Sequence, residues 1–518
     1  MIPDKIFELD YLKTLFAHNN KIEVLPTSVG DLKNLAQLRI FGNRLTWLPE
    51  ELGLCESLQT LWVQDNQLIA LPKSMGKLTQ LKILVVARNP LRSFPAELQE
   101  CENLKDIDAD GLQDTLSVPP MEITVLRDLH ELHLSHNPLM ALSDIIQTLN
   151  QLRVLRLDNT LIDEIPTFIG KLSKLRTISA VQNRLTSLPD QLCTLTSLTK
   201  VNFDSNSLHV LPEAIGKLKN LKELSVTKNK IGWIPSSIGN LHSIEEMRLS
   251  FNRLQKIPQE IGRCQTLVRL RCSHNLISQL PLELELLTNL EDLSFNSNQL
   301  ETLPSSMGAL TAMTKLDLSK NKLSRMSAVM GAWQRLEFLD LSGNMIAELP
   351  STIGNMRQMK LDLSNMELNN FPLEIVNMES LTVLDLSDNH LESLPPEIEQ
   401  LVGVEILNLE RNNLLFLPLE LGSLYTIREL LFAGNELRSP PVEHCQLTMI
   451  KSLNLDNNSL EQLPDELSRL VNLEQFSATN NRLTFLPLTF GHLKNLTHFD
   501  VSGNEMVTPP MEVCSAGA

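Results

Sequence analysis

The chain has 518 residues, of which 42% are hydrophobic, 21% are charged and 4% are aromatic. An apolar fraction this high excludes a disordered chain, and the net charge of −17 argues against nucleic-acid binding, because a phosphate-binding protein needs a basic surface. No stretch is apolar over the roughly eighteen residues that a membrane span needs, and residues 1–9 are too polar for a signal peptide, so we expect a soluble, intracellular chain.

One motif, LxxLxLxxNxLxxLPxxIGxL, repeats along almost the whole chain with a period of 23 residues. Its asparagine stands at 20, 43, 66, 89 and 137, then in steps of 23 from Asn183 to Asn344 and from Asn389 to Asn504. Three further repeats carry a substitute at this position, namely Leu112, Thr160 and Met366. The sequence therefore predicts a single domain over residues 1–518, built from about 22 repeats.

Each repeat predicts the same local structures. Alternating apolar residues such as Leu38 and Ile40 predict a short strand whose intervening residues point outward. The asparagine is expected to hydrogen-bond the backbone of adjacent turns, the proline to hold an extended return, and the IGxL segment to form a short helical or 3₁₀ turn. Since no repeat can bury its own apolar face, we predict that the repeats stack and build a common core between them.

The period breaks in two places. The repeat around 112–139 has 25 residues, and the repeat around 356–368 has 22. Loops released at such irregularities are favoured places for partner contacts. Residues 1–11 and 508–518 match half-repeats, which indicates either modest caps or a piece of a longer protein.

The repeat resembles that of the leucine-rich-repeat superfamily, and within it the Ras group. That group includes plant intracellular Ras-group-related proteins, the Scribble and Erbin polarity scaffolds, and the leucine-rich scaffold of the Ras–Raf pathway. The resemblance covers residues 2 to about 517. It implies a curved α/β solenoid, with a parallel β-sheet on the concave face and short helical or 3₁₀ turns and extended segments on the convex face. It also implies an intracellular chain that binds proteins, with Ras-type GTPases, kinases or phosphatases as the expected partners. The chain lacks the clustered cysteine cap of secreted relatives, which favours a reducing compartment, the cytoplasm.

Outward-facing residues of the first four repeats predict an aromatic and cationic patch. Its members are Phe16, Arg39, Phe41, Trp62, Val85 and Arg88. Aromatic residues and arginine dominate the hot spots of protein interfaces, so we interpret the patch as a protein-binding surface. The alternative is a scatter of tolerated surface apolar residues.

An acidic zone follows from Glu97 to Glu164, with 14 acidic and 4 basic residues. Asp108 and Asp110 are expected on its inner face, together with Asp106 and Asp158. The string from Asp106 resembles the start of a calcium-binding loop, but that loop needs a glutamate where this chain has Ser117. We therefore predict no metal site here.

A basic zone lies between Lys228 and Pro281, with 8 basic and 3 acidic residues. We expect Arg248, Phe251, Arg269, Arg271 and His274 to cluster on adjacent strands, where an acidic or phosphorylated partner could bind; a solvated face is the alternative. Farther on, Asp317, Asp340, Asp362 and Asp385 share one column, and because LDLS is the repeat consensus they are interpreted mainly as scaffold.

No motif of enzymatic chemistry is present: the chain has no GxxxxGK[ST], GxSxG or CxxC sequence. We predict no catalytic residue, no cofactor, no metal and no small-molecule substrate. The predicted function is a protein-binding scaffold or adaptor in intracellular signal transduction. Two alternatives stay open, namely the recognition arm of a larger multidomain enzyme (a cyclase, kinase or Roc-type GTPase), and an immune or cell-polarity adaptor at the membrane cortex.

Overall fold

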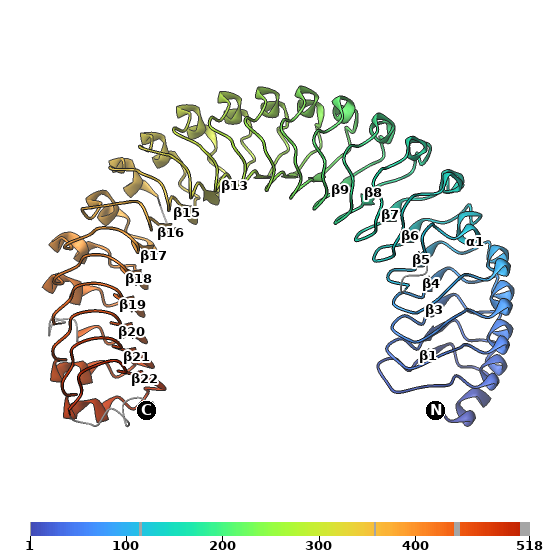
Figure 1. Ribbon diagram of the computed structural model, residues 1–518, viewed down its shortest axis with the longest axis horizontal. Coiled ribbons are helices and arrows are strands. Elements are labelled where there is room, and N and C mark those ends of the chain that lie inside the picture. The colour runs from blue at the N-terminus through green and yellow to red at the C-terminus, as the bar shows by residue number, and fades with distance from the viewer. Residues whose placement is uncertain (1, 113–115, 357–358, 440–445, 508–518) are drawn as a thin grey trace. The chain divides into compact units, whose positions relative to one another are not determined.

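The computed structural model describes residues 2–112, 116–356, 359–439 and 446–507. Contacts divide the chain into two units, Met1–Leu254 and Gln255–Ala518, and each unit is described by itself. In both units a strand and a short helix alternate along the chain (Figure 1). Within each unit the strands line the concave side and the helices lie on the convex side, as predicted.

The strands of the first unit are parallel, and each pairs with the next one along the chain without a shift in register. They are β1 (Thr14–Phe16), β2 (Gln37–Arg39), β3 (Thr60–Trp62), β4 (Ile83–Val85), β5 (Asp106–Asp108), β6 (Glu131–His133), β7 (Val154–Arg156), β8 (Thr177–Ser179), β9 (Lys200–Asn202), β10 (Glu223–Ser225) and β11 (Glu246–Arg248). The helices are the α-helix α1 (Met121–Thr124) and the 3₁₀ helices η1 (Asp4–Glu8), η2 (Thr27–Asp31), η3 (Glu50–Leu54), η4 (Lys73–Lys77), η5 (Ala96–Glu100), η6 (Asp144–Thr148), η7 (Thr167–Lys171), η8 (Asp190–Thr194), η9 (Glu213–Lys217) and η10 (Ser236–Asn240).

The second unit follows the same plan, with parallel strands paired in chain order. Its strands are β12 (Arg269–Arg271), β13 (Asp292–Ser294), β14 (Lys315–Asp317), β15 (Phe338–Asp340), β16 (Met359–Asp362), β17 (Leu381–Asp385), β18 (Ile406–Asn408), β19 (Glu429–Leu431), β20 (Ser452–Asn454), β21 (Gln475–Ser477) and β22 (His498–Asp500). Its described helices are 3₁₀ helices: η11 (Gln259–Arg263), η12 (Leu282–Leu286), η13 (Ser305–Ala309), η14 (Ala328–Ala332), η15 (Ser351–Asn355), η16 (Leu373–Asn377), η17 (Pro396–Gln400), η18 (Leu419–Ser423), η20 (Asp465–Arg469) and η21 (Leu488–His492).

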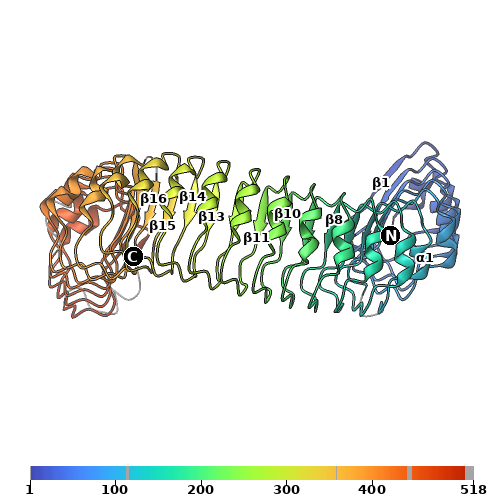
Figure 2. The ribbon, with the colours of Figure 1, turned by 90° about the horizontal axis from the view of Figure 1, so that it is seen from above.

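The repeat pattern accounts for both kinds of element. In β2 the side chain of Leu38 is buried, while Gln37 and Arg39 on either side of it remain partly exposed, which is the predicted alternation. Before η2, Pro26 lies in an extended conformation with φ −63° and ψ 153°, and its carbonyl accepts the first bond of the turn, from the amide of Val29. Figure 2 shows the resulting turns side by side along the convex side, for example between β8 and β11.

The repeated asparagine bonds the backbone of its own repeat and of the preceding one. The Nδ2 group of Asn66 donates to the carbonyls of Val63 and Ile40, both at 3.0 Å, and its Oδ1 accepts from the amide of Leu45 at 2.9 Å. Only 7% of Asn66 is exposed, so these backbone groups have no ready access to water. The predicted role of the asparagine is confirmed.

The residues that replace the asparagine make different bonds. Where Thr160 replaces the asparagine, its hydroxyl donates to the carbonyl of Leu157, and where Met366 does so, its amide donates to Asn389 Oδ1 at 3.0 Å. The 25-residue repeat carries α1 in place of a 3₁₀ helix. In the 22-residue repeat the strand pairing shifts between Met359 and Lys360. Residues 113–115 and 357–358 lie outside the described ones.

The two half-repeats differ in what can be described. In the segment 1–11, η1 forms and Phe7 is 1% exposed, so the side chain fills a core position. The half-repeat predicted at 508–518 lies outside the described residues.

We expect Asn66→Ala to lower the free energy of unfolding by about 3 kcal/mol, because it leaves buried backbone groups without partners. Asn150→Ala is the matched control: Asn150 is exposed, and its replacement should change stability by less than about 0.5 kcal/mol. Urea unfolding followed by circular dichroism measures both. Equal effects of the two substitutions would contradict this role of the asparagine.

Candidate functional site

The concave side of the first unit carries an aromatic platform, defined here as Phe16, His18, Arg39, Phe41 and Trp62. Phe16, Arg39 and Trp62 come from β1, β2 and β3 and are register partners in the sheet. The stack of repeats therefore places side chains 23 residues apart against one another. The structure brings together four of the six residues predicted for the first patch. A fifth, Val85 on β4, is the register partner of Trp62.

The platform is organised by ring contacts. His18 and Phe41 stack with their ring centres 4.5 Å apart and an angle of 11° between the rings, and Phe41 lies 6.3 Å from Trp62. The guanidinium carbon of Arg39 lies 4.7 Å from the centre of the Phe16 ring and 4.2 Å from that of Trp62. Half of Phe16 is exposed, so the platform offers apolar surface to a partner. A preordered surface of this kind loses little conformational freedom on binding.

His18 is a member that the sequence analysis missed. It follows β1 by two residues, in the same position relative to its strand as Phe41 has after β2. Treating the position two residues after each strand as a further outward-facing position of the repeat could have found His18.

Arg88, the last of the predicted residues, does not join the platform. It lies in the turn after β4 with φ 53°, and it pairs with Asp65 through two hydrogen bonds, Nε to Oδ1 and Nη2 to Oδ2, the second at 2.6 Å. Its charge is therefore compensated within the chain.

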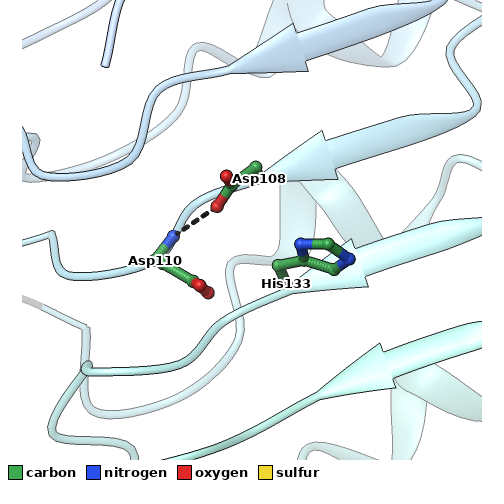
Figure 3. Close-up of side chains that lie close together, drawn as sticks. All are labelled: Asp108, Asp110 and His133. Carbon is green, nitrogen blue, oxygen red and sulfur yellow. Dashed lines mark hydrogen bonds between the residues drawn. The ribbon is translucent and has the colours of Figure 1, made fainter. Parts of the chain in front are cut away.

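A second group of polar side chains lies on β5 and β6 and in the turn after β5. Asp108 and His133 are register partners, and ligand-type atoms of Asp108, Asp110 and His133 all lie within 4.8 Å of one another (Figure 3). The Asp110 carboxylate accepts a hydrogen bond from the amide of Ser135 at 2.6 Å. The predicted acidic face is present, and His133 lies within it.

Burial shifts the titration of this group. Burial, with Asp108 and Asp158 nearby, raises the pKa of Asp110 to about 7. Burial also lowers the pKa of His133, so its imidazole is neutral at pH 7. The group is therefore close to a protonation change at physiological pH.

Two carboxylates and a neutral imidazole are donors that a divalent transition metal accepts. Donor atoms around such an ion stand about 3.5 Å apart, and the ligand-type atoms of this group lie within 4.8 Å of one another. The Asp106 to Gly111 string itself is an ordinary repeat, since Ile107 and Ala109 are buried in the core.

The predicted basic cluster is divided between the two units. In the first unit, Arg248 on β11 bonds Glu246 Oε1 at 2.6 Å, while Phe251 lies in the following turn with φ 56° and 44% of its side chain exposed. The Nζ atom of Lys228 lies 5.9 Å from the centre of the Phe251 ring. Arg248 therefore already has a carboxylate partner.

In the second unit, Arg269 and Arg271 lie on β12, and Arg271 bonds Asp292 Oδ2 at 2.6 Å. His274 lies in the turn that follows, with φ 53°. The expectation that Phe251 and His274 lie on strands is wrong, because both occupy the left-handed turn position beyond the strand end. The stack also supplies intramolecular carboxylates that a pattern of basic residues alone does not reveal.

The aspartate column of the second unit is scaffold, as interpreted. Oδ1 atoms of these aspartates accept hydrogen bonds from the amide two residues ahead, at 2.9 to 3.1 Å; the pairs are Asp317 with Ser319, Asp340 with Ser342, Asp362 with Ser364, and Asp385 with Ser387. These carboxylates hold the turns at the strand ends.

In the described part of the chain, no helix has the length and apolar character that crossing a membrane requires.

Comparison with protein-family models gives two matches. A model described as leucine-rich repeat region matches residues 140–230, and a leucine rich repeat model matches 220–241, 335–356, 380–401 and 449–470. No curated protein matches the chain.

Several solved structures resemble the chain. A leucine-rich-repeat protein of Leptospira interrogans is 33% identical, with a TM-score of 0.65 and 69% of this chain and 92% of that chain covered. A TDR receptor is 26% identical, with a TM-score of 0.72 and coverages of 96% and 90%. The plant peptide hormone receptor RGFR1, solved in complex with RGF2, is 27% identical, with a TM-score of 0.66 and coverages of 93% and 88%.

The raised pKa of Asp110 predicts a pH-dependent stability. The folded chain retains a proton there that the unfolded chain, with its ordinary value of 3.8, has lost, so this group makes stability fall as the pH rises from about 4 to about 7. Asp110→Asn keeps an oxygen for the Ser135 amide and removes the charge. We expect it to stabilise the protein by about 1 to 2 kcal/mol at pH 7.5 and to have little effect at pH 4.5.

Thermal unfolding at the two pH values measures this difference. Asp163→Asn, at an exposed position of the same acidic zone, is the control and should change the stability by a similar amount at both pH values. A destabilised Asp110→Asn protein at pH 7.5 would refute the expectation.

Proposed function

The chain belongs to the leucine-rich-repeat family, and we propose that it is a non-enzymatic scaffold or adaptor of intracellular signal transduction that binds partner proteins on its concave surface. Ras-type GTPases, kinases and phosphatases are the partner classes proposed, and the cytoplasm is the proposed location. The aromatic platform is the observation that carries this proposal.

The platform has the composition of a protein-binding hot spot. It groups two phenylalanines, a tryptophan and an arginine on neighbouring strands or just beyond a strand end, in a chain with only 4% aromatic residues. Such residues provide most of the binding energy of an interface when a partner excludes water from them. The backbone beneath them is paired in a regular sheet, so the platform is held on a rigid support.

The comparisons support protein binding as the use of this fold. RGFR1 is a peptide hormone receptor whose structure was solved in complex with RGF2. We extend to this chain the general use, the binding of a polypeptide, and not that receptor's ligand.

The cysteines support the proposed location. Cys55, Cys101, Cys193, Cys264 and Cys272 are free and buried, and burial raises the pKa of Cys55 and Cys101 to about 11. They serve as small core residues, which suits a compartment where thiols stay reduced.

We expect Phe16→Ala with Trp62→Ala to weaken partner binding at least about thirty-fold, the effect of losing one strong hot spot. Affinity purification with the full chain as bait, followed by quantitative mass spectrometry, measures this. Trp47→Ala is the matched control, since Trp47 is 46% exposed but lies outside the platform. The partners of the wild type should be kept by the control and lost by the double variant.

Circular dichroism establishes that the double variant folds. If Phe16→Ala with Trp62→Ala folds and retains the same partners, the platform is not the binding surface. The identity of the captured proteins tests the proposed partner classes separately.

A further inference from the structure

Arg39 is a cation held between two aromatic rings. Its guanidinium carbon lies 4.7 Å from the centre of the Phe16 ring and 4.2 Å from the centre of the Trp62 ring. The two rings come from the strands on either side of β2, so the sheet register maintains the arrangement. A guanidinium restrained in this way has fewer orientations to lose when it binds a ligand.

The charge of Arg39 has no counterpart within the described part of the chain. Three other arginines, by contrast, are paired with carboxylates: Arg88 with Asp65, Arg248 with Glu246, and Arg271 with Asp292. The side chain of Arg39 makes no ion pair or hydrogen bond with a described residue. It is therefore an uncompensated positive charge in a chain of net charge −17.

Hydrogen-bond donors without acceptors gather at the same place. The Nε group of Arg39 and the Nε1 group of Trp62 are buried donors with no partner among the described residues, and Oε1 of Gln64 is a buried acceptor with none. An unsatisfied buried polar group costs about 1 to 3 kcal/mol. A shift of these side chains toward an oxygen-bearing ligand would recover part of that cost.

We propose that Arg39 is the receptor for a carboxylate on a partner's peptide segment, an aspartate or glutamate side chain whose apolar neighbour packs on Phe16. The proposal rests on the protein-binding role of the platform and adds the chemistry of the bound segment. A carboxylate accepts two parallel hydrogen bonds from a guanidinium, and its single negative charge matches the single uncompensated cation. A phosphate, with nearly two negative charges, would need a further cation, and Arg88 is already paired with Asp65.

Peptide display provides the probe. Random dodecapeptides are selected on the full-length protein, and the affinities of selected peptides are measured by fluorescence polarisation. We expect the selected peptides to share an Asp or Glu beside an apolar residue. Replacement of that Glu by Gln in the peptide, or Arg39→Gln in the protein, should each weaken binding about ten-fold or more.

A double-mutant cycle then identifies the contact. If Arg39 binds the peptide carboxylate, the peptide in which Gln replaces Glu should bind the wild-type protein and the Arg39→Gln protein almost equally well. The ion pair is already lost in that peptide, so removing Arg39 has little left to remove. Arg39→Lys should recover less than half of the loss on a logarithmic scale, since lysine keeps the charge but lacks the planar fork. Arg156→Gln is the matched control: Arg156 has the same strand position on β7, is exposed, and lies outside the platform, so affinity should not change.

Each outcome separates this proposal from the protein-binding role. Peptides that bind through Trp62 but show less than two-fold coupling between Arg39 and their acidic residue would overturn the carboxylate assignment alone. Tighter binding when phosphoserine replaces the Glu would overturn the choice of carboxylate over phosphate. Selected peptides that are indifferent to both Arg39→Gln and Trp62→Ala, or an absence of enriched peptides, would overturn both proposals.

Discussion

In most repeats one buried asparagine side chain provides the bonds on which the stack depends. Its Nδ2 group donates hydrogen bonds to carbonyls in its own repeat and in the preceding one, and its Oδ1 atom accepts a hydrogen bond from a backbone amide of the preceding repeat. An apolar side chain could fill the same space but could not bond these backbone groups. The hydrophobic core brings the repeats together, and the asparagine bonds determine how far one repeat is displaced from the next.

The fixed displacement between repeats determines which side chains meet on the concave side. Because neighbouring strands pair without a shift, a side chain meets the residue 23 positions away rather than its neighbours in sequence. The position of Arg39 between the rings of Phe16 and Trp62 arises in this way. So do the ion pairs of Asp65 with Arg88 and of Asp388 with Arg411. A surface property of this protein therefore belongs to two or three adjacent repeats and cannot be assigned to one.

The periodic part of the structure could be predicted from the sequence, and the pairings between side chains could not. The alternation around Leu38, the 3₁₀ turns after the prolines and the bonds of the asparagine follow from local chemistry repeated many times. The ion pair of Arg248 with Glu246 and that of Arg271 with Asp292 depend on rotamers and on the strand twist, which a residue pattern does not contain. The turn positions of Phe251 and His274 were missed because the consensus does not mark where a strand ends.

The turn after each strand contains a backbone position that limits which residues are favourable there. In the described part of the chain, each turn after a strand has a residue with a left-handed backbone, and the turn after β16 has two, Asn365 and Glu367. Only five of these residues are glycine: Gly42, Gly111, Gly343, Gly434 and Gly503. An ordinary side chain in that conformation costs about 1 kcal/mol, less for asparagine or aspartate. Residues such as Arg88, Phe251 and His274 are thus kept where folding alone would favour glycine. This row of turns is a place where the chain can carry different side chains without changing the core beneath them.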